Sequence, residues 1–183
     1  MWHEVFDVWY EATFDALEDT IRTCPHDLWS RSMWEVAKDP AQPRALASDG
    51  NLHPLGDEVL SAVWKVAWHG LVANEFNLAG RPAGFRLPSR FAHLDARLPS
   101  GMAGEGEVVP TDPPARDDLL AYLTHNRDLV RARLDAAREV GDGTSTLGPW
   151  TGPTSTLLSM FHGNACHLVS HSAEVGMFVH QLR

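Results

Sequence analysis

The segment between residues 57 and 79 constrains the fold most, because it is apolar on nearly every side. Read at 3.6 residues per turn, it carries large apolar side chains all round a helix instead of along one stripe. A helix of that kind must be covered on more than one side, so we expect it to pack among other helices. A partner subunit is the first candidate for the remaining cover, which predicts a homodimer. The alternative is that the first helix and the long loops cover Trp64 and Trp68 completely. The apolar side chains are Val63, Trp64, Val66, Ala67, Trp68, Leu71, Val72 and Phe76.

Three further segments show apolar side chains at helical spacing, and together with the first they predict four long helices. One spans residues 2–23 and ends before Pro25, because proline cannot continue the hydrogen-bonded backbone of a helix. Another opens at TDPPARDD, where prolines suit a first turn and acids complement the positive helix end, and it ends at residues 141–143. The last begins between residues 151 and 154 and runs almost to Arg183.

The buried line expected on the last helix is interrupted by polar side chains. It connects apolar residues near both ends of the helix and passes through Asn164, His167 and His171. Burying two neighbouring histidines without partners would cost several kcal/mol, about 2–7 for each polar group. A bound cation or an exposed position would remove that cost. The apolar residues of this line are Leu157, Phe161, Val175, Phe178 and Leu182.

No segment alternates apolar and polar residues at a period of two, so a sheet is not expected. The predicted fold class is all-α, with residues 1–183 forming a single four-helix-bundle domain. Two connections are long, at residues 24–56 and 80–112, and such connections permit neighbouring helices to run parallel.

The net charge of −9 argues against a broad nucleic-acid-binding face, because phosphate contacts need clustered lysines and arginines. The two cysteines, Cys24 and Cys166, form no CxxC pair, and we expect both to be reduced. The N-terminal residues are acidic and do not have the pattern of a signal peptide, and no uncharged apolar run reaches about 18 residues. These features predict a cytoplasmic protein that binds a small molecule and neither nucleic acid nor membrane.

Three of the ten histidines favour a metal site. His167 and His171, in the sequence HLVSH, are four residues apart, so a helix places both on one side, where two imidazoles can reach one ion. His69 can supply a third nitrogen from a facing helix, and three neutral ligands leave coordination positions open for chemistry. The alternative is that these histidines are ordinary core or surface residues. A zinc-protease HExxH motif is excluded, because Leu168 stands where that motif needs glutamate.

Four stretches of the chain, in this order, resemble the DinB/YfiT-like superfamily, which includes mycothiol-dependent maleylpyruvate isomerases and bacillithiol S-transferases. The resemblance implies a four-helix bundle running up-down-down-up and a divalent metal, zinc or nickel, with iron as a further possibility. It implies the ligands His69, His167 and His171, although some relatives have glutamate where this chain has His167. The four stretches are VWKVAWHGLVANEFNLAG, GFRLP, DDLLAYLTHNRDLVRARL and HLVSHSAEVGMFVHQLR.

The function that follows is a metal-dependent thiol S-transferase that uses a low-molecular-weight thiol such as mycothiol, activated at the metal. Two alternatives stay open: a metal-dependent isomerase or hydrolase that needs no thiol, and a non-catalytic metal- or ligand-binding stress-response protein. Tyr122 and Asn126 are candidates to orient a substrate, or else are ordinary residues of the helix seam. Arginines of the connection at 80–112 are candidates to bind carboxylates of the thiol or substrate, or else are simply solvated. They are Arg81, Arg86, Arg90 and Arg97.

Overall fold

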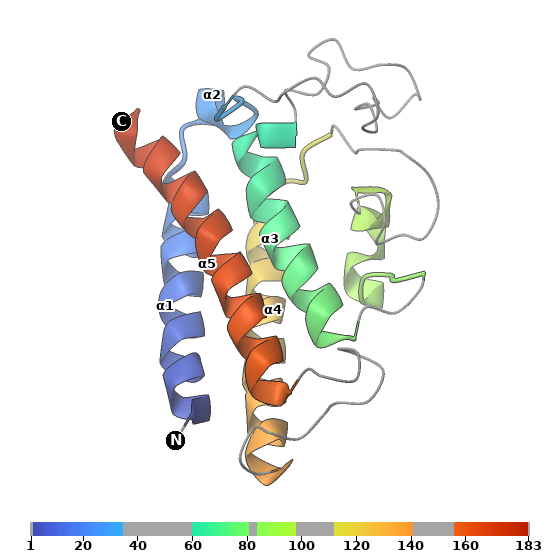
Figure 1. The fold of residues 1–183 in the computed structure, drawn as a ribbon. Coiled ribbons are helices and arrows are strands. Elements are labelled where there is room, and N and C mark those ends of the chain that lie inside the picture. The colour runs from blue at the N-terminus through green and yellow to red at the C-terminus, as the bar shows by residue number, and fades with distance from the viewer. Residues whose placement is uncertain (1, 35–59, 81–83, 98–111, 141–155, 183) are drawn as a thin grey trace, which may run out of the picture.

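The computed structural model of the chain describes residues 2–34, 60–80, 84–97, 112–140 and 156–182 (Figure 1). Within these ranges every regular element is helical, and an isolated bridge pairs Ser32 with Ala62. The predicted all-helical class is therefore confirmed. The elements are α1 (Trp2–Thr23), α2 (His26–Trp29), α3 (Val63–Leu78), the 3₁₀ helix η2 (Ser89–Arg97), α4 (Arg116–Val140) and α5 (Leu157–Gln181).

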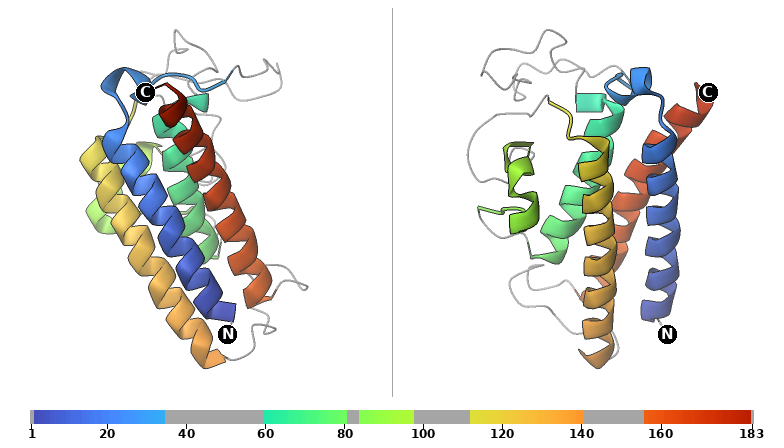
Figure 2. Two further views of the ribbon diagram at one scale, coloured as in Figure 1. Left: turned by 90° about the vertical axis from the view of Figure 1, so that its left-hand side faces the viewer. Right: turned by 180° about the vertical axis from the view of Figure 1, so that it is seen from behind.

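The four long helices pack around one core. Helix α1 packs against α5 and α4, and α3 packs against the same two helices from the other side. In Figure 1, α1 and α5 run from bottom to top, whereas α3 and α4 run from top to bottom, and both further views agree (Figure 2). Helices α1 and α4 are therefore antiparallel, and Arg127 of α4 forms ion pairs with Glu11, Asp15 and Glu18 of α1. Neighbouring helices are thus parallel in two pairs and antiparallel in the other two.

The ends of the helices follow local sequence signals. Helix α1 has the predicted bounds, and α3 ends just before Gly80, whose positive φ of 87° suits a residue without a side chain. Helix α3 begins at Val63, later than the predicted residue 57, and residues 57–59 lie outside the described ranges. Helix α5 begins after a capping box in which Thr156 and Ser159 exchange hydrogen bonds. The predicted start at residues 151–154 and the predicted stop at 141–143 also lie outside those ranges.

Helix α3 is the central element of the core, as its all-round apolar sequence indicated. Trp64 and Trp68 are 0% exposed in the single chain. Both tryptophans of α3 are therefore covered within the same chain, and they need no partner subunit. Of the two interpretations of this segment, complete cover of the tryptophans within the chain is the one observed. The apolar surface of α3 therefore gives no reason to expect a dimer.

The buried line of α5 differs from the predicted one. It runs through Asn164, Leu168, Ser172, Val175 and Val179. The predicted line placed its C-terminal half at Phe178 and Leu182, but Phe178 is only half-buried and Leu182 is 46% exposed. The reason is the spacing: the buried line advances from Asn164 by two steps of four residues to Leu168 and Ser172, whereas a step of three followed by one of four would have arrived at the histidines.

Two short helices lie in the connections that the sequence left without structure. Helix α2 follows α1 directly, and Arg116 at the start of α4 holds this corner by donating hydrogen bonds to the carbonyl oxygens of Cys24 and Pro25. Helix η2 packs on α4 through the buried Phe91, whose ring lies 5.1 Å from that of Tyr122. The remainder of both connections lies outside the described ranges. None of the helices in the described part of the chain is long and apolar enough to cross a membrane.

Candidate metal centre

Three imidazoles converge where α3 and α5 face each other. His69 comes from α3, and His167 and His171 come from successive turns of α5. One ring nitrogen of each lies within 4.8 Å of the others, and the ring centroids are 4.5–5.3 Å apart. We call these residues the histidine triad. The residues predicted as metal ligands are therefore brought together, in a cluster that can hold a metal ion.

The triad lies at the rim of the core and not within it. All three histidines are partly exposed, whereas Leu168, between the two histidines of α5, is fully buried. The predicted course of the buried line through His167 and His171 is corrected accordingly: both residues flank that line on the side of α3. A rim position leaves room for a further ligand beside an ion, which a closed structural site does not offer.

Glu174 fixes the orientation of one ligand. Its Oε2 accepts a hydrogen bond of 2.9 Å from Nδ1 of His171, three residues earlier on α5. A proton on Nδ1 leaves Nε2 as the unprotonated nitrogen of the neutral ring, and this nitrogen faces the triad. A carboxylate placed behind a histidine in this way is the usual outer partner of a metal-binding imidazole, and it also raises the basicity of the ligand nitrogen.

The spacing within α5 suits coordination. Nε2 of His171 lies 3.1 Å from Nε2 of His167. Two lone pairs at that distance repel each other unless a proton or a cation lies between them. A tetrahedral zinc ion with bonds of about 2.05 Å separates its ligand nitrogens by about 3.3 Å, close to the spacing found here. His167 also has a buried Nδ1 without a hydrogen-bond partner among the described atoms, so this ring is not yet fully satisfied.

The surroundings of the triad favour neutral imidazoles. Burial, as the largest cause, and the neighbouring His171, His167 and Lys65 together lower the pKa of His69 to about 4. Burial also lowers the pKa of His167, with His171 acting in the same direction and Glu174 opposing it. Because only the unprotonated ring can donate a lone pair, both shifts keep these ligands ready to bind a cation at neutral pH.

Gly70 allows α3 and α5 to approach closely beside the triad. A Cβ atom at this position would lie 3.3 Å from Cβ of His171 and 3.5 Å from Cδ1 of Leu168. The first of these distances is tighter than an ordinary contact, so a Cβ here would require α3 and α5 to give by a few tenths of an ångström. The glycine next to His69 therefore helps to set the distance across which the three rings meet.

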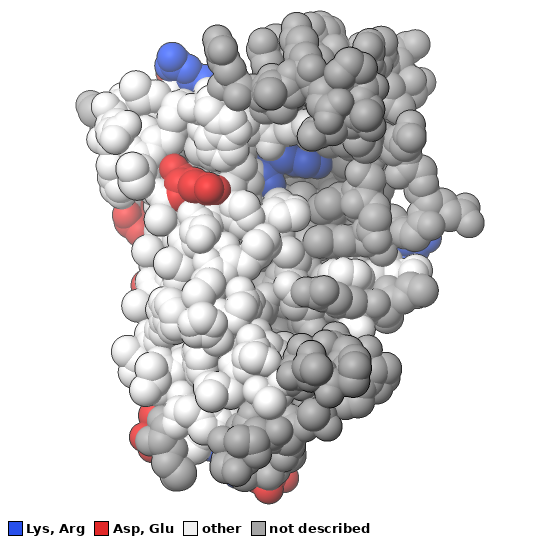
Figure 3. All heavy atoms as spheres, viewed as in Figure 1, with Lys and Arg blue, Asp and Glu red and all other residues white. Residues whose placement is uncertain are grey.

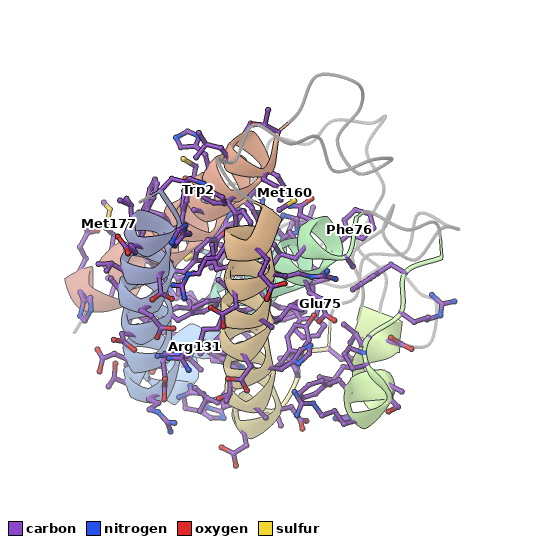
Figure 4. The ribbon with its side chains drawn as sticks, turned by 90° about the horizontal axis from the view of Figure 1, so that it is seen from below. Trp2, Glu75, Phe76, Arg131, Met160 and Met177 are labelled. Atoms are coloured by element: carbon purple, nitrogen blue, oxygen red, sulfur yellow. The ribbon has the colours of Figure 1, made fainter. Side chains whose placement is uncertain are left out.

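The other residues predicted to take part in the site have different surroundings. Tyr122 is fully buried and donates a hydrogen bond of 2.6 Å to Oε2 of Glu75, and Asn126 pairs with Asn74. Both lie in the seam between α3 and α4, which favours the interpretation that they are ordinary seam residues. Figure 4, viewed along the bundle, shows Glu75 on the side where η2 lies.

The predicted arginines are not brought to the triad by any described contact. Arg86 is exposed and donates to the carbonyl oxygen of Phe85, and Arg90 stacks on the ring of Phe91, 4.8 Å from its centroid. Arg81 and the side chain of Arg97 lie outside the described residues.

Sequence reasoning missed a cluster of buried amides close to the triad. Asn164 on α5 donates to Oδ1 of Asn74 at 2.6 Å, and Asn74 donates to Oδ1 of Asn126 on α4 at 2.8 Å. We call these three residues the amide cluster; Asn77 donates to it from α3 at 3.0 Å. The signal was present in the sequence, since Asn74 interrupts the most apolar segment of the chain and Asn164 interrupts the predicted line on α5.

Comparison with known proteins adds no identification. No protein-family model, no curated protein and no solved structure matches the chain. The chemistry assigned to the triad therefore depends on its own geometry and surroundings.

Proposed function

We propose that the chain is a metal-dependent enzyme of the DinB/YfiT-like kind, which transfers a low-molecular-weight thiol such as mycothiol to a small electrophile. The observation that carries the proposal is the convergence of three imidazoles at an accessible rim. A site with three protein ligands keeps at least one coordination position for a thiol, a water molecule or a substrate oxygen.

The course of the chain supports the resemblance to that superfamily. The directions of α1, α3, α4 and α5 in Figure 1 agree with an up-down-down-up bundle, and the ligands come from the second and fourth of these helices. The antiparallel pairing of α3 with α5 is what brings position 69 level with positions 167 and 171.

Each residue of the site has a definite task in this proposal. His69, His167 and His171 would hold the ion, and burial keeps two of these rings unprotonated at neutral pH. Glu174 holds the proton of His171 at Nδ1, so that Nε2 stays free to bind. When bound, a divalent ion lowers the pKa of a thiol or water ligand and polarises a carbonyl oxygen. The half-buried position excludes part of the solvent, and this strengthens electrostatic effects at the site.

The first test is metal content. Zinc and nickel are the first candidates and iron the third, since all three accept imidazole nitrogen. Elemental analysis of protein purified without added metal should find about one divalent ion per chain, and His69→Ala should lose it. His162→Ala is the control, because this histidine is exposed on α5, the helix of His167 and His171, and lies outside the triad. Equal metal content in the wild type and His69→Ala would contradict the site.

The second test is activity. Metal-loaded protein should accelerate the formation of thioethers between mycothiol and monochlorobimane, and His167→Ala should abolish the acceleration while His162→Ala retains it. Isomerase or hydrolase turnover without any thiol would favour the thiol-independent alternative. Stoichiometric metal without turnover across panels of thiols and electrophiles would favour a non-catalytic binding protein.

A homodimer remains part of the proposal, on a different surface from the one first expected. The face of α5 seen in Figure 3 carries few charged side chains among its described atoms. Met177 of α5 is exposed. Val5 and Val8 of the adjacent α1 are exposed as well, Val8 to 70%. Two copies with a charge of −9 each repel, so they associate with least cost through an uncharged face. Light scattering of the wild type and Val8→Glu tests this: a monomer in both contradicts it.

A further inference from the structure

The seam between α3 and α4 holds a carboxylate and a histidine that the proposed reaction does not use. Oε2 of Glu75, on α3, lies 3.3 Å from Nε2 of His125, on α4, and their side chains are only 10% and 17% exposed. The two atoms are close enough to attract each other as charges, but they are not aligned as a hydrogen bond. Nε2 of His125 is therefore buried without a hydrogen-bond partner among the described atoms. We call these two residues the seam pair.

Tyr122 fixes the carboxylate of the seam pair. Its hydroxyl donates a hydrogen bond of 2.6 Å to the same oxygen, Oε2 of Glu75. Burial first, and then the charge of Glu75 and the hydrogen bond to it, raise the pKa of Tyr122 well above its ordinary value. Asp95 adds to this rise and Asn126 opposes it. The hydroxyl therefore keeps its proton, and histidine is the one type of side chain in this group that ordinarily changes charge between pH 5 and 8.

Helix η2 covers the α4 side of the seam pair with an apolar ring. Phe91 of η2 is buried, and its ring lies 5.1 Å from that of Tyr122 and 5.5 Å from that of His125. In Figure 4, Glu75 lies on the side of the bundle where η2 lies. Docking of η2 removes water from beside the pair, and the cost of removing it depends on the charge that the pair carries.

The charge of the seam pair sets the direction of the effect. With His125 neutral, the carboxylate of Glu75 leaves a net negative charge beside the buried ring. Asp95 of η2 is a second negative charge at this contact, since it acts on Tyr122. With His125 protonated, the pair is neutral overall, and little water screens the attraction across 3.3 Å. Proton binding by His125 therefore favours the docked position of η2.

Two further charged groups of η2 change this balance less. Arg90 is exposed and stacks on the ring of Phe91, 4.8 Å from its centroid, and its charge is the same throughout this pH range. Nε2 of His93 lies 3.3 Å from Oδ1 of Asp118 on α4, but these side chains are 54% and 38% exposed, so solvent screens the pair. The buried seam pair is therefore the stronger source of a pH-dependent contact.

We propose that the seam pair is a pH-sensitive switch for the docking of η2: a proton on His125 holds η2 against α4, and loss of the proton weakens this contact. The stabilisation is present while His125 is protonated, and it is lost as pH rises and the proton leaves. The switch uses contacts outside the histidine triad. It goes beyond the proposed reaction and is tested without the metal centre.

The test is amide hydrogen exchange of the full-length protein without added metal, at about pH 5.5 and about pH 8. Protection factors correct for the intrinsic pH dependence of exchange, and the amides of α1 serve as the reference for global unfolding. Relative to this reference, the amides of η2 should be about five- to tenfold better protected at the lower pH in the wild type. Equal protection at both pH values overturns the switch.

Three variants assign the effect to particular residues. Glu75→Gln keeps an acceptor for Tyr122 but removes the charge, and His125→Gln removes the titrating group. In both variants the ratio of protection should fall to about one or below. His93→Gln is the matched control and should keep most of the ratio, because its pair with Asp118 is exposed.

Two results overturn the role of the seam pair: a ratio that is unchanged in His125→Gln, or one that is lost in His93→Gln alone. Should His125→Gln fail to fold, His125→Phe repeats the measurement, because it keeps an aromatic ring against Phe91 and cannot titrate.

Discussion

The histidine triad and the amide cluster are both polar, both join α3 to α5, and lie within two helical turns of each other. They differ in whether their hydrogen-bonding atoms are satisfied within the cluster. In the amide cluster each side chain donates to or accepts from another, and Asn74 and Asn126 are fully buried. In the triad, ring nitrogens of different residues point at a common centre from a partly exposed rim. Polar groups that satisfy one another's hydrogen bonds stabilise a fold, whereas groups whose lone pairs converge on one point are able to bind a cation there.

The largest predicted effect is a loss of metal affinity, which should follow a substitution in the triad. Structural zinc sites with four ligands gain about 10–16 kcal/mol, so each ligand is worth about 3 kcal/mol and His171→Ala should weaken Zn²⁺ binding at least about 100-fold. Calorimetric titration measures the affinity. Urea denaturation of the metal-free variant should show a change of less than about 1 kcal/mol, because the ring lies at the rim. A large loss of stability without loss of affinity would make the triad another structural cluster.

The fold and the triad were predictable to different depths. Helical periodicity gave α1 its observed bounds, and the four-residue spacing of His167 and His171 predicted their common side, because both depend on local geometry alone. The rim position of these histidines was not predictable, since it depends on which residues of α5 face α3. The pairing of Asn74 with Asn126 and Asn164 depends on three helices meeting, and no pattern within one segment reveals it.

Asn74→Ala, in the amide cluster, should lower the stability of the fold and leave the metal affinity nearly unchanged, which is the opposite of the result expected for His171→Ala. It leaves the amides of Asn126 and Asn164 without their shared partner, and an unsatisfied buried group costs about 1–3 kcal/mol. We expect a loss of about 2 kcal/mol in the free energy of unfolding, measured in urea, with an affinity for Zn²⁺ within about threefold of the wild type. Asn77→Ala, at the edge of the cluster, should cost less. An unchanged free energy of unfolding for Asn74→Ala would remove the contrast between the clusters.

The two clusters should also respond differently to pH, because amides do not titrate. The pKa of His69 is about 4 in the folded chain and 6.5 in the unfolded chain, so the unfolded state binds the extra proton between these values. Stability of the metal-free protein should therefore fall as pH decreases from 6.5 to about 4, by about 1–2 kcal/mol after allowance for partial exposure. Urea denaturation at several pH values measures this. His69→Phe should flatten that part of the curve; the same slope in both proteins would assign it elsewhere.

Glu174→Gln should produce a smaller change confined to the triad. Glutamine keeps an oxygen that accepts from Nδ1 of His171 but removes the charge that raises the basicity of the ring. Loss of such an outer partner lowers metal affinity by about 10-fold, at the lower end of the usual range. The free energy of unfolding should stay unchanged, since Glu174 is at the surface. Zn²⁺ affinity equal to that of the wild type would show that the carboxylate does not tune the ligand.

Gly70→Ala should have the smallest effect. The added Cβ meets Cβ of His171 at 3.3 Å, so α3 and α5 must separate by a few tenths of an ångström. We expect metal affinity to fall about three- to fivefold, because the ligand nitrogens move apart by a similar amount. Gly163→Ala is the matched control on α5, where a Cβ meets nothing within 4 Å. Equal affinities for both variants would mean that helix separation does not limit the site.

Because His69 and the pair on α5 are roughly a hundred residues apart in the chain, an ion held between them acts as a removable cross-link. Like a disulfide, it closes a long loop and penalises the unfolded ensemble, but its strength is set by the free metal concentration. With an ion bound, α3 and α5 would be joined in two ways: permanently by the amide cluster, and by the ion wherever metal is supplied. The melting temperature of such a protein reports the metal status of its surroundings.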